Sequence, residues 1–353
     1  MKQTRRIPDC EMALAIETDE TGLGFWFLPV MRELARQGVE PLDGRRGRMR
    51  MNVGRLLCRG VLIKNFSYGS RAVIQVSANR GSGGWFPRGM TNEIVPLIFD
   101  CWETNWTFWE RTMKRGRVRT AMFTSSQAAE EMSQRIPGLR AIWVPEAIEL
   151  SDYKLGGALS ERSIGLLEIG RSFARFNQVI REPLAKSGVK HLYSLEGHVF
   201  PTRKELAEGL ADARAVLCYP RSITHPGHAG KVETITLRYF ETMAAGAIVV
   251  GHAPAELVKL FGYNPVVEID PEGGAASASA LLEVINAPEQ YQELVDSNTK
   301  RLAEVGTWQT RVQDLLAVLN ETGYTTTGIP VEGSGRGTVS EIPRAATAGT
   351  CPA

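Results

Sequence analysis

The second half of the chain alternates short apolar runs with helical patterns, and this order constrains the fold more than any other feature. Helical patterns at residues 203–211, 237–245 and 254–261 each lie between two apolar runs. Strands that alternate with helices form βαβ units, whose right-handed crossovers build a parallel sheet. We therefore predict a Rossmann-type domain with strands at residues 163–169, 191–195, 215–220, 247–251 and 265–269, followed by a helical stretch at 288–320.

The first half shows a weaker version of the same pattern. It has apolar runs at 14–16, 61–63, 72–77, 95–100, 121–126 and 141–146, and helical patterns at 27–37 and 102–114. We predict an α/β fold of two Rossmann-like domains that face a cleft, with a boundary in the polar, Gly-containing segment 149–160. The predicted domains are residues 1–150 and 151–324. Residues 325–353, rich in Gly, Thr, Ser, Ala and Pro, are predicted to form a disordered tail.

Length and composition exclude several other classes. At about 150 residues per domain, 353 residues fit two domains. No apolar run reaches the roughly 18–20 residues that a membrane span needs, so we expect neither a span nor a signal peptide. The five cysteines are scattered and form no C-x-x-C spacing, which favours a cytoplasmic protein and disfavours a zinc site.

The net charge of +2 conceals an uneven distribution of charge. Residues 1–150 carry 22 basic and 16 acidic residues (22 − 16 = +6), and the remainder carries 19 and 23 (19 − 23 = −4). Six arginines lie between Arg45 and Arg59. This surplus is consistent with an acidic ligand, a nucleic-acid surface or a solvated basic face.

The most informative segment is residues 225–251, HPGHAGKVETITLRYFETMAAGAIVVG. Glu233 and Glu241 are separated by seven residues, so on or just before one helix they would lie about 12 Å apart along its axis. That distance is comparable to the polar spine of a nucleotide-diphosphate sugar, which includes the diphosphate. We expect the helix N-terminus near residues 234–237 to offer unpaired backbone amides to this diphosphate.

This segment resembles the retaining glycosyltransferases of the GT-B fold, especially the glycosyl transferases group 1 (family 4-like) set. The resemblance rests on the E-x7-E spacing and on the run RYFETMAAGAIVV at residues 238–250. It extends over about residues 95–320 and is strongest from 163 to 270. It implies that residues 151–324 bind the nucleotide sugar and that residues 1–150 form the acceptor side. It also implies transfer of a hexosyl or related group with retention, without a metal or a separate cofactor. The absence of a D-x-D motif agrees with metal independence.

The resemblance also implies roles for individual residues. Glu241 would bind the donor ribose, and Glu233 would contact the transferred sugar as a catalytic residue. Arg171, in an Ile-Gly-Arg turn after a strand, would bind the diphosphate, because a guanidinium stays charged and can bind phosphate oxygens through two N–H groups.

Further donor-binding candidates lie around these three residues. Arg175 is a possible second cation after the turn. His228 and Lys231 precede the first acid and could reach a phosphate, and Arg238 opens the run that carries the resemblance. His225 and His228 show no third partner, so we predict no metal site.

The sequence departs from the family pattern at several points. The usual glycine after the first acid is replaced by Thr234-Ile235-Thr236, and related branches lack a clear first acid, so Glu233 could be coincidental. All five histidines lie in the second half, and Asp100 is therefore our candidate for the acceptor-side group.

Two alternatives stay open beside the enzyme. One is a GT-B-like binding protein without turnover. The other is a nucleic-acid-binding protein that uses the basic first half, although we favour a nucleotide sugar and an anionic acceptor as partners. The sequence specifies neither the donor base, the sugar nor the oligomeric state.

Overall fold

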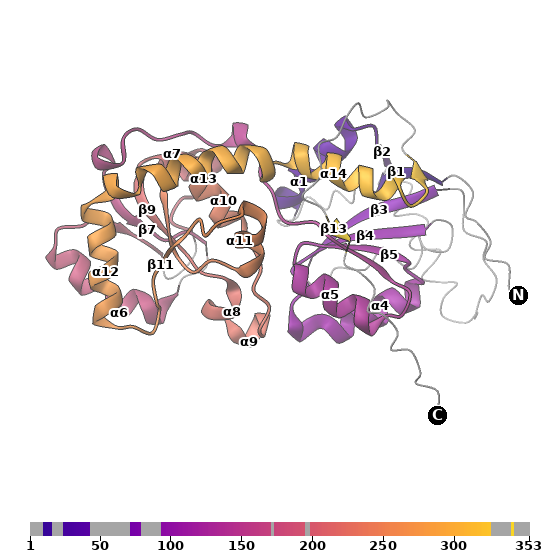
Figure 1. The fold of residues 1–353 in the computed structure, drawn as a ribbon, viewed down its shortest axis with the longest axis horizontal. Helices are drawn as coiled ribbons and strands as arrows, with labels where there is room; N and C mark the ends of the chain where they lie inside the picture. The colour runs from indigo at the N-terminus through magenta and orange to yellow at the C-terminus, as the bar shows by residue number, and fades with distance from the viewer. Residues whose placement is uncertain are drawn as a thin grey trace, which may run out of the picture. The chain divides into compact units, whose positions relative to one another are not determined.

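The computed structural model describes residues 10–15, 24–42, 71–78, 93–170, 173–194, 198–325 and 340–341. The chain divides into two compact units. Unit 1 comprises Met1–Pro145 and Val312–Ala353, and unit 2 comprises Glu146–Arg311. Each unit has its own sheet of mainly parallel strands with helices packed on it (Figure 1). The predicted α/β fold with two Rossmann-like units is therefore confirmed.

The sheet of unit 1 has the strand order β12-β1-β3-β4-β5-β6-β13, and β2 also pairs with β1. Its described pairings are parallel except that of β13 with β6. The strands are β1 (Cys10–Ala15), β2 (Glu40–Leu42), β3 (Arg71–Ala78), β4 (Glu93–Phe99), β5 (Thr120–Phe123), β6 (Arg140–Trp143), β12 (Tyr324–Thr325) and β13 (Ser340–Glu341). Since β2 adds to one side of β1 and β3 to the other, the strand order reverses direction at β1.

Helices cover both faces of this sheet. They are α1 (Gly24–Arg36), η1 (Glu103–Asn105), α4 (Trp106–Gly116), α5 (Ser126–Arg135) and the second part of α14 (Trp308–Asn320). Within unit 1, α4 and α5 lie on one face, and α1 and α14 lie on the other (Figure 1). Every residue of β4 is buried, as expected for a parallel strand covered on both faces. The sequence did not predict β2 or α5, and the predicted strand 61–63 lies outside the described residues.

The sheet of unit 2 has the order β11-β10-β9-β7-β8, with parallel pairing throughout. Its strands are β7 (Ile164–Leu167), β8 (His191–Leu192), β9 (Ala213–Cys218), β10 (Ile248–Gly251) and β11 (Val267–Glu268). Each overlaps one of the five apolar runs that the sequence predicted as strands. From β7 the chain goes to β8 on one side, and then to β9, β10 and β11 on the other. The strand order therefore reverses between β7 and β9.

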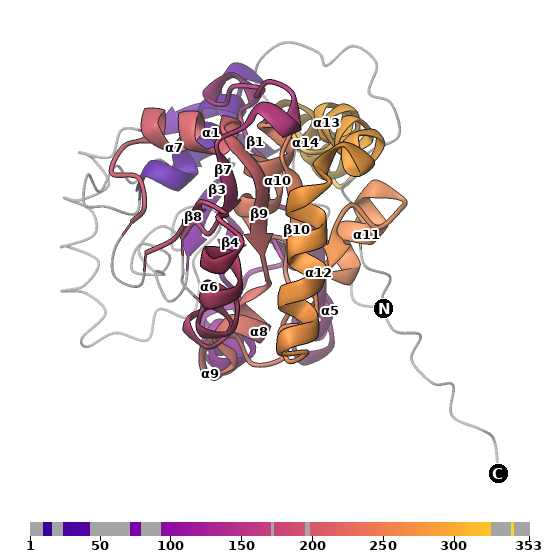
Figure 2. The same cartoon turned by 90° about the vertical axis from the view of Figure 1, so that its left-hand side faces the viewer.

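Helices surround this second sheet and complete its core. They are α6 (Ala174–Lys186), α7 (Arg203–Ala211), α8 (Arg221–Thr224), α9 (Pro226–Ala229), α10 (Leu237–Ala244), α11 (Ala255–Phe261), α12 (Ala275–Asn286) and α13 (Gln292–Val305), with the short turns η2 (Leu150–Asp152), η3 (Leu159–Glu161) and η4 (Pro288–Tyr291). Figure 2 shows α6 and α12 side by side along the sheet.

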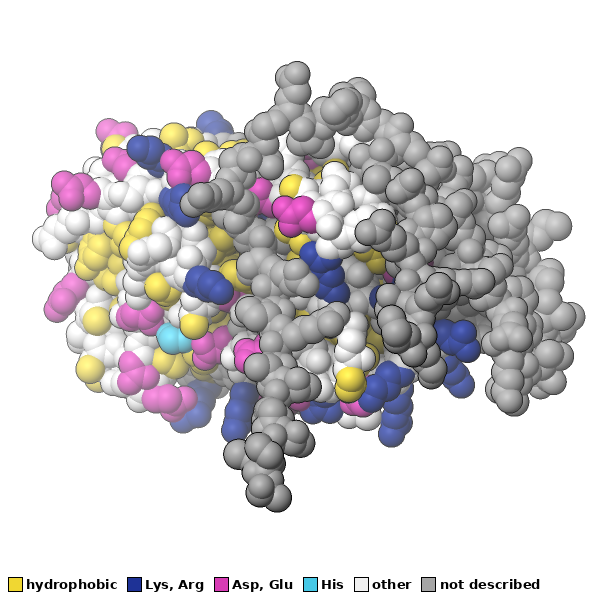
Figure 3. Space-filling view, turned by 45° about the vertical axis from the view of Figure 1, so that its right-hand side comes forward, with side chains coloured by type: hydrophobic (Ala, Val, Ile, Leu, Met, Phe, Trp, Pro, Cys, Tyr) yellow, Lys and Arg dark blue, Asp and Glu magenta, His cyan; other side chains and the backbone are white. Residues whose placement is uncertain are grey.

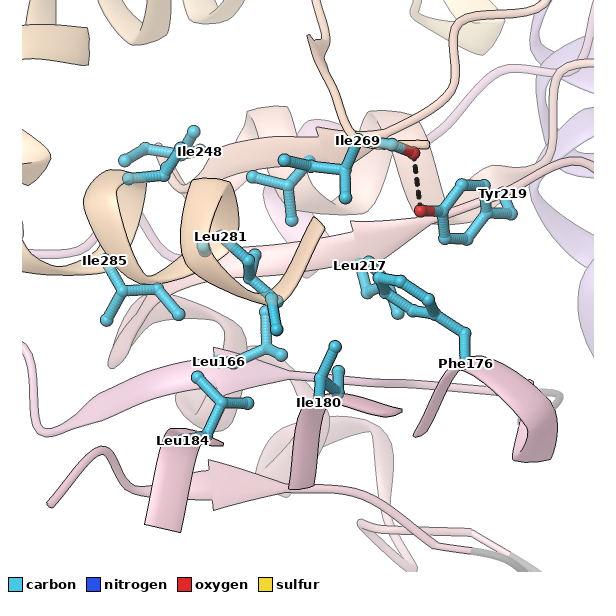
Figure 4. Packing of buried hydrophobic residues seen from close by; sticks show 14 of the residues in the cluster. Leu166, Phe176, Ile180, Leu184, Leu217, Tyr219, Ile248, Ile269, Leu281 and Ile285 are labelled. Carbon is cyan, nitrogen blue, oxygen red and sulfur yellow. Dashed lines mark hydrogen bonds between the residues drawn. The ribbon is translucent and has the colours of Figure 1, made fainter. Parts of the chain in front are cut away.

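The core under α6 and α12 is a cluster of buried apolar side chains from both helices and from the strands (Figure 4). Leu166, Leu217 and Ile248 contribute from three neighbouring strands. The Tyr219 hydroxyl lies in this cluster and donates a hydrogen bond of 2.7 Å to the carbonyl oxygen of Ile269. This bond satisfies a buried hydroxyl and ties the end of β9 to the segment after β11.

The end of the chain returns to unit 1, which differs from the domain limits of 151–324 that the sequence indicated. Val312 onward belongs to unit 1. The physical reason lies at Tyr324, whose strand pairs with β1 and whose buried hydroxyl donates 2.6 Å to Glu93 Oε1. Of the predicted disordered tail, the structure describes Thr325 in β12 and Ser340–Glu341 in β13, and the rest lies outside the described residues.

We expect Tyr324→Phe to destabilise unit 1 by about 1–3 kcal/mol, because the buried Glu93 carboxylate and Thr120 hydroxyl both lose a partner. Urea unfolding followed by fluorescence measures this loss. Tyr263→Phe is the matched control, because it removes a less buried hydroxyl bonded to Asn298 in unit 2. Equal, small effects of the two substitutions would contradict the role given to Tyr324.

Candidate functional site

The carboxyl edge of the unit 2 sheet carries most of the residues that the sequence singled out. In open α/β sheets, ligands bind outside the carboxyl ends of strands where the strand order reverses, here between β7 and β9. Gly170 follows β7 with a φ of 73°, and a Cβ at this position would lie 3.0 Å from Arg238 Nη2. Glycine therefore permits both the left-handed turn and the approach of the Arg238 guanidinium to the backbone.

Arg238 is the second residue of α10 and is half-buried. Within the described part of the chain, its guanidinium has neither a hydrogen bond nor an ion pair, although Glu241 is near enough to interact electrostatically. A guanidinium keeps its charge and presents five N–H donors. Arg238 is thus available to an anionic ligand at this edge. Arg171, the other cation predicted here, lies outside the described residues.

Glu241 is 5% exposed, although it is an acid on a helix. Its Oε1 accepts a hydrogen bond of 2.8 Å from the hydroxyl of Tyr153. Burial raises the pKa of Glu241, and the Tyr153 hydrogen bond and the charges of Arg238 and Arg203 oppose this rise. Within the described residues, Oε2 accepts no hydrogen bond. Glu241 therefore keeps one acceptor oxygen for a ligand hydroxyl.

Tyr153 is a site residue that the sequence analysis missed. It follows η2 in the segment that we predicted as a domain boundary, 88 positions before Glu241. Asp152 beside it pairs with Arg203 at 3.0 Å, and both side chains are 37% exposed, so this pair contributes little by itself. No short-range sequence signal connects Tyr153 to α10. Burial raises the pKa of its hydroxyl, which therefore stays a hydrogen-bond donor.

Glu233 lies four residues before α10, as the E-x7-E interpretation requires, and its side chain is 35% exposed. Its Oε2 is 3.6 Å from Nε2 of His252, which follows β10. The expectation of unpaired amides between Glu233 and α10 is wrong at Ile235. The N–H of Ile235 donates 2.7 Å to Oε1 of Glu256, a buried acid in the first turn of α11. This bond holds the loop that precedes α10, where the family pattern has a glycine.

The remaining donor-binding candidates are exposed. Arg175, in the first turn of α6, pairs with Glu272 at 2.5 Å. His228 lies on α9 with its ring centroid 6.5 Å from that of His225, and Lys231 is in the turn that leads to Glu233. A ligand would have to compete with Glu272 for Arg175, whereas Arg238 needs no such exchange. The roles of these residues stay predictions.

Asp100 ends β4 in unit 1, at the carboxyl edge of that sheet, with a φ of 56°. The left-handed region costs a non-glycine residue roughly 1–2 kcal/mol. Two hydrogen bonds of 3.0 Å to its carbonyl oxygen, from Trp102 N and Asn105 Nδ2, hold this conformation. Such strain is often found at functional sites. The acceptor-side role of Asp100 stays a prediction.

Cations on the described part of unit 1 gather near the end of α4. Five are exposed: Arg111, Lys114, Arg115, Arg117 and Arg119. Lys114 pairs with Glu110 at 2.6 Å, and Arg119 pairs with Glu93. Since α4 leads from the carboxyl end of β4 back to β5, this cluster lies toward the amino edge of the sheet. Lys and Arg side chains are also visible along the lower margin of the face in Figure 3. The predicted basic segment 45–59 lies outside the described residues.

No described helix is long and apolar enough to cross a membrane. No group of three or more His, Cys, Asp and Glu side chains among the described residues could hold a metal ion.

We expect Glu241→Gln to raise the melting temperature at neutral pH, because it removes the desolvation cost of a buried carboxylate. The rise should be about 2–4 °C for each kcal/mol of this cost. The amide oxygen still accepts from Tyr153, but no charge is buried. Because burial raises the folded-state pKa of Glu241, the cost of its charge is present above that pKa and is lost as the pH falls below the unfolded value.

The melting temperatures of wild type and Glu241→Gln should therefore converge on acidification. Thermal unfolding at a series of pH values measures this convergence. A variant that melts below the wild type at pH 7 would contradict the role of burial.

Comparisons with known proteins agree with this architecture. Residues 178–317 match a family model described as "Glycosyl transferase-like". No protein with a curated description matches the sequence significantly. TarM from S. aureus has 12% identity and a TM-score of 0.53 over 70% of this chain, which spans 55% of the TarM chain.

Two other solved structures are covered almost completely. Sucrose-phosphate synthase from Thermosynechococcus elongatus has 12% identity and a TM-score of 0.57, over 88% of this chain and 98% of that one. HepE from Anabaena, solved in complex with UDP and glucose, has 10% identity and a TM-score of 0.57, over 88% of this chain and 100% of that one. At these identities the likeness establishes the fold alone.

The fold and the family model together confirm the resemblance seen in the motif of residues 238–250. The matched segment contains both Glu233 and Glu241 and four of the five strands of the unit 2 sheet. The chain has the GT-B fold, and its residues 178–317 are similar to the glycosyl transferase-like family model.

Proposed function

We propose that this protein is a glycosyltransferase that binds a nucleotide-diphosphate sugar in unit 2 and transfers its glycosyl group to an acceptor hydroxyl. One observation carries the proposal. At the reversal of the strand order, the guanidinium of Arg238 lies beside Gly170 and donates no hydrogen bond to the described residues, and Glu241 lies about one turn further along the same helix. An anion-binding group beside a hydroxyl-binding carboxylate matches the diphosphate and ribose of a nucleotide.

The residues divide the reaction between them. Oε2 of Glu241 accepts a ribose hydroxyl, and Arg238 binds the diphosphate. The bond between the anomeric carbon and the β-phosphate oxygen breaks, and the nucleotide diphosphate leaves with the electron pair. The acceptor oxygen forms the new bond and loses its proton, for which Asp100 is our candidate base. Arginine charge at the phosphates stabilises the developing negative charge of the leaving group.

Glu233 contacts the transferred sugar in this proposal, from the loop that precedes α10. The transfer proceeds with retention of the anomeric configuration and without a metal, as the family resemblance implies. UDP is the first nucleotide to test, since the HepE structure holds UDP and glucose.

We expect Arg238→Ala to weaken UDP binding by about tenfold or more, because a hydrogen bond to a charged group contributes about 1.5–3 kcal/mol. Uridine, which lacks the diphosphate, should bind both proteins equally. Isothermal titration calorimetry with UDP, GDP, ADP and TDP measures the wild type first, and then the variant with the best ligand and its nucleoside.

Lys186→Ala is the matched control for Arg238→Ala. Lys186 lies in the last turn of α6, which leads away from the carboxyl edge, and pairs with exposed Glu182. Wild-type protein that binds none of the four diphosphates would remove the proposal. Binding without release of diphosphate from any matching sugar donor would favour the inactive binding protein.

The acceptor that we propose is an extended anionic polymer. The exposed cations at the end of α4 support negative charge on the acceptor. Their place toward the amino edge, away from Asp100, supports a molecule long enough to reach both. Such contacts are screened by salt.

We expect donor turnover to rise when a polyanionic acceptor such as DNA or another phosphodiester polymer is added. The rise should shrink between 50 and 200 mM salt, because proteins that bind several phosphates lose about 10³–10⁵-fold in affinity over this range. Release of UDP is measured with and without polymer. Stimulation that is insensitive to salt, or seen only with neutral acceptors, would contradict the anionic acceptor. Tight, steeply salt-dependent DNA binding without turnover would instead support the nucleic-acid-binding alternative.

A further inference from the structure

His252 lies between two carboxylates at the carboxyl edge of the unit 2 sheet. Its Nδ1 is 3.0 Å from Oε2 of Glu268, and its Nε2 is 3.6 Å from Oε2 of Glu233. The three side chains are 35–46% exposed. They come from three separate segments: the end of β11, the residue after β10 and the loop before α10. Neither the family motif nor the proposed donor contacts assign a role to His252.

The backbone of His252 is held in one position. Gly251 has a φ of 136°, and a Cβ there would lie 2.1 Å from the carbonyl oxygen of Cys218, so only glycine allows this approach of β10 to β9. The N–H of His252 donates 3.0 Å to the same Cys218 oxygen, and the hydroxyl of Tyr239 donates 2.6 Å to the His252 carbonyl. The imidazole therefore projects from a fixed point at the strand end.

Glu268 fixes the far side of the imidazole. Its Oε1 accepts hydrogen bonds of 3.0 Å from the N–H of Ala253 and from Nδ2 of Asn264, and its Oε2 faces His252 Nδ1. A carboxylate only accepts, so Nδ1 carries the proton in this bond. With Nδ1 held by Glu268, the ring plane is set and Nε2 is directed toward Glu233. Second-partner contacts of this kind commonly orient a functional imidazole.

His252 gives the carboxylate of Glu233 a partner whose own position is fixed. Glu241 is buried on a helix and held by Tyr153, whereas Glu233 lies in a loop and is one-third exposed. A single exposed ion pair would contribute little to stability. Here the imidazole is fixed by backbone and side-chain bonds before it meets the acid. The conformational entropy that is lost when this contact forms therefore comes mainly from the Glu233 side chain.

We infer that His252 is a positioning residue for Glu233: Glu268 orients the imidazole, and the imidazole sets the carboxylate toward the transferred sugar. The inference rests on the proposed function, in which Glu233 contacts that sugar. It deepens that function by assigning recognition of the sugar to the set Glu268-His252-Glu233, while Arg238 and Glu241 recognise the nucleotide. The two groups of residues should therefore separate in binding measurements.

The test compares the affinities for UDP and for the best binder among UDP-glucose, UDP-galactose and UDP-N-acetylglucosamine. We expect His252→Ala to leave UDP affinity unchanged and to lower the sugar-nucleotide affinity about tenfold, or about 1.4 kcal/mol, because Glu233 loses the imidazole that positions its carboxylate. Glu233→Gln should likewise lower the ratio of UDP-sugar affinity to UDP affinity. In the Glu233→Gln background, His252→Ala should cause no further fall in this ratio. Calorimetry of the full-length proteins gives all the constants.

Two further variants separate positioning from folding. His252→Gln places an amide near the Nε2 position and should restore part of the ratio that His252→Ala loses. Glu268→Gln should lower the ratio less than His252→Ala does. Glu304→Gln, which alters an exposed acid paired with Arg301 on α13, is the control and should change nothing.

The outcomes distinguish the inference from the function on which it rests. Wild-type protein that binds no UDP or UDP-sugar overturns the proposed function itself. If His252→Ala binds UDP and keeps the wild-type ratio of UDP-sugar affinity to UDP affinity, only the inference is overturned. The inference is also overturned if wild-type protein binds UDP-sugars no more tightly than UDP. An equal loss of UDP and UDP-sugar affinity in His252→Ala would show a purely structural role and also overturn it.

Discussion

The parallel pairing of β9 with both β7 and β10 is the constraint on which the rest of unit 2 depends. It brings Gly170, Cys218 and Gly251 to one edge of the sheet, where β7 and β9 diverge in their connections. The Tyr239 hydroxyl ties α10 to this edge through the His252 carbonyl. The position of α10 then decides where Arg238 and Glu241 lie. The proposed donor site is thus a consequence of strand order before it is a consequence of any single side chain.

Burial separates the two acids of the E-x7-E spacing into different chemical settings. Glu241 is buried, has a raised pKa and is held by Tyr153, whereas Glu233 is partly exposed and faces an imidazole. Burying a carboxylate lowers the stability of the fold. Buried acids of this kind are typical of binding sites, where function favours them in spite of the lost stability. Two acids that belong to one sequence pattern can therefore have different roles in the site.

Much of the fold could be predicted because its signals are local. Residues 203–211 were predicted as a helix with the bounds that α7 has, since Thr202 and Glu205 form a capping box at its start. The strands of unit 2 follow from short runs of β-branched and apolar residues. By contrast, α12 was not predicted because its Ala- and Ser-rich start lacks an apolar period. The return of the chain to unit 1 was not predicted, because Tyr324 and its partner Glu93 are 231 positions apart in the sequence.

The sequence by itself determined the α/β class, the resemblance to glycosyltransferases and the E-x7-E spacing of the two candidate acids, because periodicity and motif spacing depend on neighbouring residues. Only the tertiary structure decided which groups these acids meet. Tyr153 contacts Glu241, and His252 stands between Glu233 and Glu268, because the order of strands brings distant segments together. Partners of this kind leave no trace in local pattern, since hydrogen bonds and ion pairs across a sheet edge depend on distances that the whole fold sets.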